Sequence, residues 1–242
     1  SILGMGVSMP GDGFDITGTS EHLGVICTNL QRGTQLITSP YFAKYVHYGV
    51  TASSGAALTY GTRQFGFPGE IIKQCLRNDP PIFAPYLCGE RAPIFDSKAA
   101  GAFVGVTDKT QRQDMAYSVL EGVTFALRQI KEAMHTHIHS YTVSGGAAEN
   151  VFLNRLKAEI LETEIKTVAE KDTSALGAAM VAAVGRGFFS NLNAAAAAIC
   201  KQGDSFRPTG CAFEKLEKRY EIFKQIYPAT RTINHLFREA SK

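Results

Sequence analysis

The sequence has no tryptophan, no two cysteines spaced as Cys-x-x-Cys, and little excess of either charge. An odd number of scattered cysteines is typical of a reduced, cytosolic protein without a disulfide or zinc framework. The five are Cys27, Cys75, Cys88, Cys200 and Cys211. A net charge of +3 over 242 residues gives no basis for a nucleic-acid or membrane-surface partner, and no apolar run approaches the roughly 18–20 residues that cross a bilayer. We therefore expect a cytoplasmic protein with neither kind of partner.

The N-terminus also lacks familiar features. The chain begins at Ser1 without an initiator methionine, and no basic stretch followed by an apolar one marks a signal peptide. This start predicts either a chain cut from a longer protein or an N-terminus chosen for expression. With 45% hydrophobic residues and no evident linker or repeat, residues 1–242 are expected to form one domain with a substantial core.

The hydrophobic pattern changes its period along the chain. Short β-branched and aromatic runs over 14–16, 23–27, 34–37 and 45–50 predict an antiparallel meander. An apolar stripe from Met115 to Met134 then predicts a long helix that begins with a capping box of Thr110 and Gln113. Strands are predicted at 141–143 and 165–168, with helices near 153–160, 172–185, 193–199 and 213–237, the last interrupted near Pro228. This order predicts an α/β fold with a mixed sheet and at least one parallel crossover.

Three glycine-bearing turns are candidates for a binding site. Residues 15–20, Asp-Ile-Thr-Gly-Thr-Ser, follow a strand and can direct backbone N–H groups and hydroxyls at a phosphate. Residues 144–150, Ser-Gly-Gly-Ala-Ala-Glu-Asn, lie between a strand and a helix, where two glycines let a flat group approach the backbone. In residues 53–58, small side chains allow a helix to start close to another group. Each turn also has a purely structural interpretation: a hairpin turn, a strand-to-helix turn capped by Asn150, and a plain helix start.

The three turns occur in a series of longer motifs. The most specific is residues 85–93, Pro-Tyr-Leu-Cys-Gly-Glu-Arg-Ala-Pro, followed by residues 101–107, 119–128 and 174–179 in order. In this order the chain resembles the C-terminal domain of the FGGY carbohydrate kinases, from about Gly11 to Phe237, and residues 85–93 are similar to that family's Pro-Tyr-Leu-Ser-Gly-Glu-Arg-Thr-Pro signature. The resemblance implies an actin-like (ribonuclease H-like) ATPase fold, with a mixed sheet flanked by helices, as the second of two domains around a cleft.

The resemblance also implies a site that binds ATP with magnesium. Thr19, between Gly18 and Ser20, would contact the phosphates; Gly55 and Thr59 would lie beside the nucleotide; Gly145 and Gly146 would lie near adenine and ribose; and Asn150 would hydrogen-bond the nucleotide. The chain departs from the family at Thr59, where Gln or Arg is frequent, at Tyr60, and at Cys88. The segment between Gly61 and Pro85 also looks shorter than in the family.

The rest of the implied enzyme lies outside the chain. The family's catalytic base is an Asp expected just upstream of Ser1, and the sugar or polyol would bind to the N-terminal domain. The resemblance therefore implies a sugar kinase of which this chain is the ATP-binding half, inactive by itself, with homodimers common among relatives. Which sugar is phosphorylated is not readable from these residues.

Two other functions stay open at this point. Actin-like folds also serve as non-catalytic nucleotide-binding or assembly modules, and a relative could have lost its activity; residues 85–93 favour the kinase over the module. We interpret His135, His137 and His139 as polar residues at a helix end rather than as metal ligands, since no Cys or carboxylate lies nearby. A contact of Asp15 with metal or phosphate through water is a further, less favoured alternative.

Overall fold

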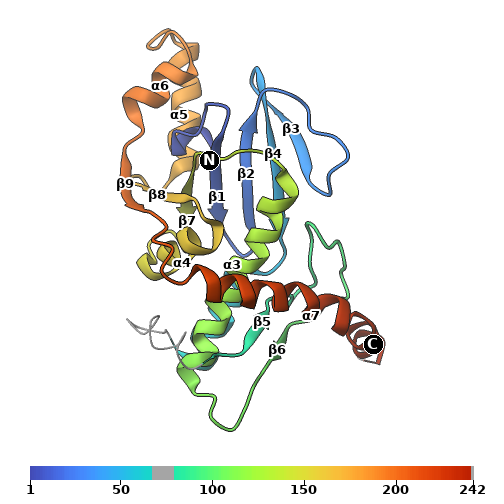
Figure 1. Ribbon diagram of the computed structural model, residues 1–242. Coiled ribbons are helices and arrows are strands. Elements are labelled where there is room, and N and C mark those ends of the chain that lie inside the picture. Colours follow the sequence, from blue (N-terminus) through green and yellow to red (C-terminus); the bar gives the residue numbers. More distant parts are fainter. Residues whose placement is uncertain (67–78, 241–242) are drawn as a thin grey trace.

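A computed structural model describes residues 1–66 and 79–240, so that Cys75 and most of the segment expected to be short lie outside the described residues. Its main element is a seven-stranded sheet in the order β3-β4-β2-β1-β7-β8-β9 (Figure 1). The strands are β1 (Asp12–Thr17), β2 (Glu21–Cys27), β3 (Ile37–Tyr41), β4 (Lys44–Thr51), β7 (Ser140–Gly145), β8 (Glu164–Val168) and β9 (Gln202–Phe206). A second sheet of two strands pairs β5 (Ile82–Ala84) with β6 (Ala102–Val104).

The sheet is mixed, as the sequence predicts. Strands β1, β7 and β8 are parallel, and α4 (Val151–Leu161) connects β7 to β8 as a crossover. The remaining pairs, β1 with β2, β2 with β4, β3 with β4 and β8 with β9, are antiparallel. The predicted α/β class is therefore confirmed.

The other helices cover the two faces of the sheet. They are η1 (Leu3–Met5), α1 (Ser54–Phe65), α3 (Arg112–Met134), α5 (Thr173–Gly185), α6 (Leu192–Ile199) and α7 (Phe213–Ala240). Leu23 and Val25 of β2 pack with α3 and α4, whereas Ile26 packs with η1 on the other side, because successive strand residues point to opposite faces. Helices α5 and α6 stand together at one corner of the molecule, at upper left in Figure 1.

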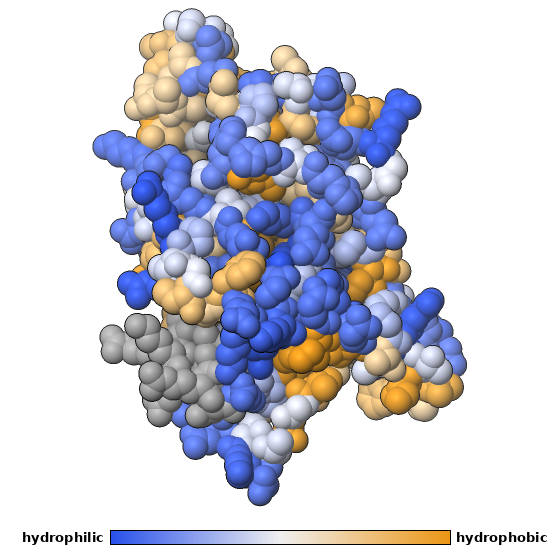
Figure 2. Space-filling view, in the orientation of Figure 1, coloured by the Kyte–Doolittle hydropathy of each residue, from blue (hydrophilic) through white to orange (hydrophobic). Residues whose placement is uncertain are grey.

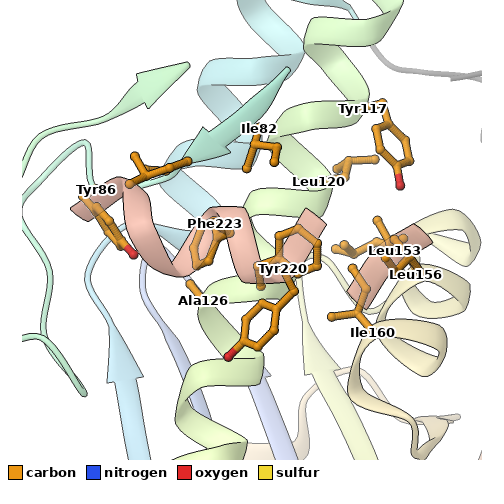
Figure 3. Packing of buried hydrophobic residues seen from close by; sticks show 14 of the residues in the cluster. Ile82, Tyr86, Tyr117, Leu120, Ala126, Leu153, Leu156, Ile160, Tyr220 and Phe223 are labelled. Carbon is orange, nitrogen blue, oxygen red and sulfur yellow. The ribbon is translucent and has the colours of Figure 1, made fainter. Parts of the chain in front are cut away.

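Helix α7 closes a large part of the core. It crosses α3 and places Tyr220 and Phe223 against Leu153 and Leu156 of α4 and the β5 region (Figure 3). Glu121, inside α3, is fully buried and accepts hydrogen bonds from Arg219 of α7 at 2.6 and 2.7 Å. This ion pair fixes α7 to α3.

Three details of the sequence prediction are wrong. The first four strands do not form a simple meander, because β4 rather than β3 lies beside β2. Helix α3 begins one residue later than the Thr110 box implies: its N-cap is Gln111, whose backbone N–H donates to Asp114 at 2.9 Å. Helix α7 continues through Pro228, and Tyr227 and His235, on the two sides of the proline, both hydrogen-bond Asp96.

Two of the apolar areas of the surface lie over helices. Figure 2 shows them over the alanine-rich corner of α5 and α6 and at the C-terminal end of α7, where Ile233, Leu236 and Phe237 are exposed. Within 1–66 and 79–240, no helix combines the length and apolar character needed to span a bilayer.

Candidate functional site

The turn after β1 and the turn after β7 lie side by side. Thr17, the last residue of β1, is in register with Gly145, the last residue of the parallel strand β7. Carboxyl ends of parallel strands meet at one edge of a sheet, which is where α/β proteins bind ligands. A cleft of about 1940 Å³ opens at this edge.

The walls of the cleft come from all three predicted turns. Its lining comprises residues of the turn after β1, one side of α1, the start of α4 and the segment that precedes α7. Six of the eight predicted site residues line it: Gly18, Thr19, Gly55, Thr59, Gly146 and Asn150. Gly145 lines a smaller neighbouring cavity instead, and Ser20 lines neither.

The turn after β1 is tight and leaves donors free. The Gly18 N–H donates to the Ser20 carbonyl oxygen at 2.8 Å, so both groups serve the turn itself. Thr19 is exposed, and in the described part of the chain neither its N–H nor its hydroxyl has a partner. Thr19 therefore offers two donors to the cleft.

Helix α1 begins directly against this turn. A Cβ atom on Gly55 would lie 1.9 Å from the Gly18 carbonyl oxygen, and the Ala56 N–H donates to the Thr19 carbonyl oxygen at 3.1 Å. Only glycine permits this approach at position 55. The first turn of α1 contains no acidic residue, so no carboxylate of the helix itself reduces the positive potential at its N-terminus.

The two adjacent glycines have different environments. Gly145 has a φ of +95°, and a Cβ there would lie 2.1 Å from the Thr17 carbonyl oxygen, so Gly145 is required by the turn. Gly146 donates its N–H to that same oxygen at 3.2 Å, and no atom lies within 4 Å of the place where its Cβ would be. Only Gly146 therefore leaves open space beside the backbone for a ligand.

Asn150 is the N-cap of α4, which agrees with the structural alternative given for it from the sequence. Its side-chain oxygen accepts the Leu153 N–H at 3.0 Å. The side-chain NH₂ group has no partner among residues 1–66 and 79–240, and Asn150 lines the cleft. The cap and a ligand contact are thus compatible in one side chain.

A buried ionic cluster lies beneath the cleft. The Lys157 Nζ of α4 donates to Asp15 and to Glu21, each at 2.6 Å, and all three side chains are almost completely buried. Asp15 thus points into the protein, and the structure does not support its contact with metal or phosphate through water. Glu21 and Lys157 were not predicted as parts of the site. A lysine four residues after Leu153 falls on the apolar inner face of α4, and this position could have indicated a buried ion pair.

Burial and charge have opposing effects on the three groups of this cluster. Burial and the neighbouring Glu21 raise the pKa of Asp15 well above its usual value, against the influence of Lys157. Burial is the largest single influence on Glu21 and would raise its pKa, but the charge of Lys157 together with the hydrogen bonds from Asp15, Lys157 and Ser54 lowers that pKa to about 2. Burial likewise opposes the charged form of Lys157, yet the two carboxyl groups raise its pKa. The same surroundings therefore act in opposite directions on the two carboxyl groups, raising the pKa of Asp15 and lowering that of Glu21.

Glu159 of α4, which was not predicted as a site residue, binds the segment before α7 that forms one wall of the cleft. One of its oxygens accepts the Thr209 N–H at 2.8 Å and the Thr209 hydroxyl at 2.7 Å, and the other accepts the Gly210 N–H at 3.0 Å. The cleft also contains Arg63 of α1 and Arg155 of α4, for which no ion pair is present within the described ranges. The site is therefore rich in donors and suited to an anionic ligand with a flat, less polar part.

Comparison with known proteins places these features in a family. Residues 15–186 match the family model described as "FGGY family of carbohydrate kinases, C-terminal domain". A xylulose kinase of Lactococcus lactis is 32% identical over 199 residues, which are 77% of this chain and 40% of that protein. A glycerol kinase of Enterococcus faecalis is 36% identical over 165 residues, or 66% of this chain and 32% of that protein.

Solved structures show the same fold. The ligand-bound xylulose kinase of Lactobacillus acidophilus matches with a TM-score of 0.87 at 23% identity, over 98% of this chain and 51% of that one. The glycerol kinase of Plasmodium falciparum with ADP matches with a TM-score of 0.78 at 19% identity, over 93% of this chain and 48% of that one. The chain thus spans between about one third and about one half of the length of these proteins.

Proposed function

Since the chain belongs to the FGGY family of carbohydrate kinases, we propose that it supplies the ATP-binding half of an enzyme that phosphorylates a sugar or polyol hydroxyl. The observation that carries the proposal is the meeting of three turns at one cleft: the turn after β1, the start of α1 and the turn after β7. The family membership supports this reaction, and the cleft supports nucleotide binding as the part that these residues perform.

In this proposal the phosphates lie between Thr19 and the start of α1. The free N–H and hydroxyl of Thr19 donate to phosphate oxygens, and the N-terminus of α1, whose first turn has no acidic residue, adds positive potential. The nucleoside extends past Gly55 and Thr59 toward Gly146, where the backbone is open on one side. Asn150 donates from its NH₂ group, whereas Gly145 and Ser20 shape the turns rather than touch the nucleotide.

Magnesium is proposed to enter with the nucleotide. Among residues 1–66 and 79–240 there is no group of three His, Cys, Asp or Glu side chains that could hold a metal ion. Asp15 and Glu21, the carboxyl groups nearest the phosphate turn, are both committed to Lys157. In phosphate-binding enzymes magnesium is commonly held by phosphate oxygens and water with few carboxylates, so this chain's donors need to orient only the phosphates.

The proposal assigns the remaining chemistry to the other half of the longer protein. The catalytic Asp and the sugar-binding residues are expected there, and we propose a cytoplasmic, homodimeric enzyme. Four free cysteines among the described residues agree with a reducing compartment. We expect this chain alone to show no sugar-dependent release of ADP from ATP; rapid release with xylulose or glycerol would contradict that assignment.

Calorimetric titration of the chain with Mg-ADP tests the proposal. A valine at Gly146 projects into open space beside the double glycine and should abolish saturable binding while the fold is kept. Gly185→Val in α5 is the matched control, because Gly185 also has open space around its Cβ position and does not have a positive φ. Binding by the wild type and the control but not by Gly146→Val is expected; equal binding by all three would place the nucleotide elsewhere.

A further inference from the structure

The cluster of Asp15, Glu21 and Lys157 makes more hydrogen bonds to its surroundings than a simple buried ion pair needs. Glu21 accepts hydrogen bonds from three groups: the Lys157 ammonium at 2.6 Å, the Thr17 hydroxyl at 2.5 Å and the Ser54 hydroxyl. These donors belong to three different walls of the cleft. One carboxylate therefore joins the turn after β1, the start of α1 and α4.

The same three walls touch one another at the cleft surface. Thr17 accepts the Gly146 N–H through its carbonyl oxygen at 3.2 Å, and Gly55, next to Ser54, lies against the Gly18 carbonyl oxygen. The contacts above the cluster are thus backbone to backbone, and the contacts inside it are side chain to side chain. A shift of Glu21 or Lys157 would be transmitted to Thr19, Gly55 and Gly146 together.

Stability alone does not explain such a cluster. Taking an ammonium and a carboxylate out of water is costly, and an apolar group of similar volume is often equally stable or more so. An ion pair with directed hydrogen bonds, by contrast, fixes one geometry, and a binding site needs its donors held within about 0.5 Å. These properties suit the cluster to hold the donors of the binding site in fixed positions.

We propose that Lys157 is a positioning residue of the nucleotide site, which with Glu21 sets the spacing between the phosphate-facing turn, the start of α1 and the double-glycine turn. This inference rests on the proposed function, because it concerns the same cleft. Lys157 itself does not touch the nucleotide, since its side chain is buried beneath the cleft.

Removal of the ammonium should change how binding depends on pH. The titratable groups that face the cluster are Asp15 of β1, Glu21 of β2 and Tyr141 of β7, whose pKa is raised by burial and by Asp15. Without Lys157, burial raises the pKa of Glu21, because its compensating cation is gone. The higher pKa brings protonation of Glu21 closer to neutral pH, and the spacing of the three walls changes when Glu21 is protonated.

A second buried ion pair provides a matched control. Arg219 and Glu121 join α7 to α3 at 2.6 Å, and neither residue lines the cleft. A Glu121→Gln variant removes a buried charge of comparable environment. It should lower the melting temperature without altering nucleotide affinity.

The experiment compares wild type, Lys157→Met, Lys157→Met with Glu21→Gln, and Glu121→Gln. Melting temperatures are measured first, and Mg-ADP is then titrated well below each melting temperature at several values between pH 6 and 8. We expect Lys157→Met to bind at least tenfold more weakly, with an affinity that varies with pH. The double variant should recover melting temperature but not affinity, and it keeps the test decisive where the single variant does not fold.

The outcomes separate the two proposals. Wild-type affinity and a flat pH profile in the double variant, or in Lys157→Met, would show that the cluster only stabilises the fold. An equal loss of affinity in Glu121→Gln would likewise overturn the positioning role. Absence of Mg-ADP binding by the wild type would overturn the proposed function and this inference with it.

Discussion

Gly55 lies so close to Gly18 that a Cβ atom on Gly55 would stand 1.9 Å from the Gly18 carbonyl oxygen. The contact places the first turn of α1 against the turn after β1, and the Ala56 N–H reinforces it by donating to Thr19 at 3.1 Å. The positive end of a helix and the free donors of Thr19 thereby face the same part of the cleft. This relationship makes position 55 the most sensitive in the proposed phosphate site.

We expect Gly55→Ala to separate α1 from the turn. The added methyl group overlaps a backbone oxygen, which is not free to rotate away, so the helix must shift at a cost of roughly 1–3 kcal/mol. Mg-ADP affinity should fall at least tenfold, because the donors on the two sides no longer converge. Chemical denaturation and calorimetry measure the two effects, with Gly185→Ala as the control for a helical glycine in open space; unchanged affinity in Gly55→Ala would contradict the account.

The adjacent glycines predict a contrast in stability. Gly145→Ala places a Cβ 2.1 Å from the Thr17 carbonyl oxygen at a φ of +95°, and should lower the free energy of unfolding by about 2 kcal/mol or more. Gly146→Ala meets no atom within 4 Å and should stay within about 0.5 kcal/mol of wild type. Urea denaturation of the two variants checks this, and equal destabilisation would show that the turn differs from the one described.

Asn150 allows its two roles to be separated. Serine also caps helices well, so Asn150→Ser should keep the free energy of unfolding within about 0.5 kcal/mol, whereas Asn150→Ala should lose about 1 kcal/mol. Serine lacks the NH₂ group, and we expect both variants to bind Mg-ADP several-fold more weakly. Wild-type affinity in Asn150→Ser would reduce the residue to a helix cap.

Glu90 predicts a dependence of stability on pH. The residue is 5% exposed, and one carboxyl oxygen accepts the Ala52 and Arg91 N–H groups, each at 2.7 Å. Burial raises its pKa from 4.5 to about 7, against the effect of these hydrogen bonds. Between these two values the unfolded chain has lost the proton that the native protein keeps, so unfolding releases a proton and stability falls as pH rises.

A Glu90→Gln variant should remove this dependence. Glutamine keeps the oxygen that accepts both N–H groups and has no proton to lose. The difference in unfolding free energy between the variant and wild type should therefore grow in favour of the variant by up to about 3 kcal/mol from pH 4.5 to 7 and then level off. Urea denaturation at several pH values measures it; parallel curves for the two proteins would show that the Glu90 carboxyl group is not perturbed.

Most elements whose formation depends on neighbouring residues could be predicted from the sequence. The long stripe of α3, the crossover through α4 and the Asp172 cap of α5, which accepts the Ala175 N–H at 2.9 Å, all depend on neighbouring residues. Strand β9 has no such pattern: its residues Gln202–Phe206 are mainly exposed and polar, and they form a strand only through pairing with β8. The order of β3 and β4 likewise depends on contacts between strands rather than on either strand's own residues.

Long-range side-chain contacts explain the other differences. Pro228 removes one backbone N–H from α7, but Tyr227 and His235 bind Asp96 at 2.9 and 2.7 Å and hold the helix together on both sides. Residue patterns alone identified the three turns of the cleft separately, and only the family resemblance predicted that they form one site. The register of β1 with β7 explains why two of them meet. Lys157 lies 142 residues from Asp15 and 136 from Glu21, so no local pattern in the sequence could pair them.

The most direct test of the central claim is a titration of the isotopically labelled chain with Mg-ADP, followed by the amide NMR spectrum. The account predicts that the largest saturable shifts occur at Thr19, at the start of α1 around Gly55, and at Gly146, with little change in the α5–α6 corner. Saturable shifts confined to other parts of the chain, or no shifts at nucleotide concentrations in the millimolar range, would contradict it.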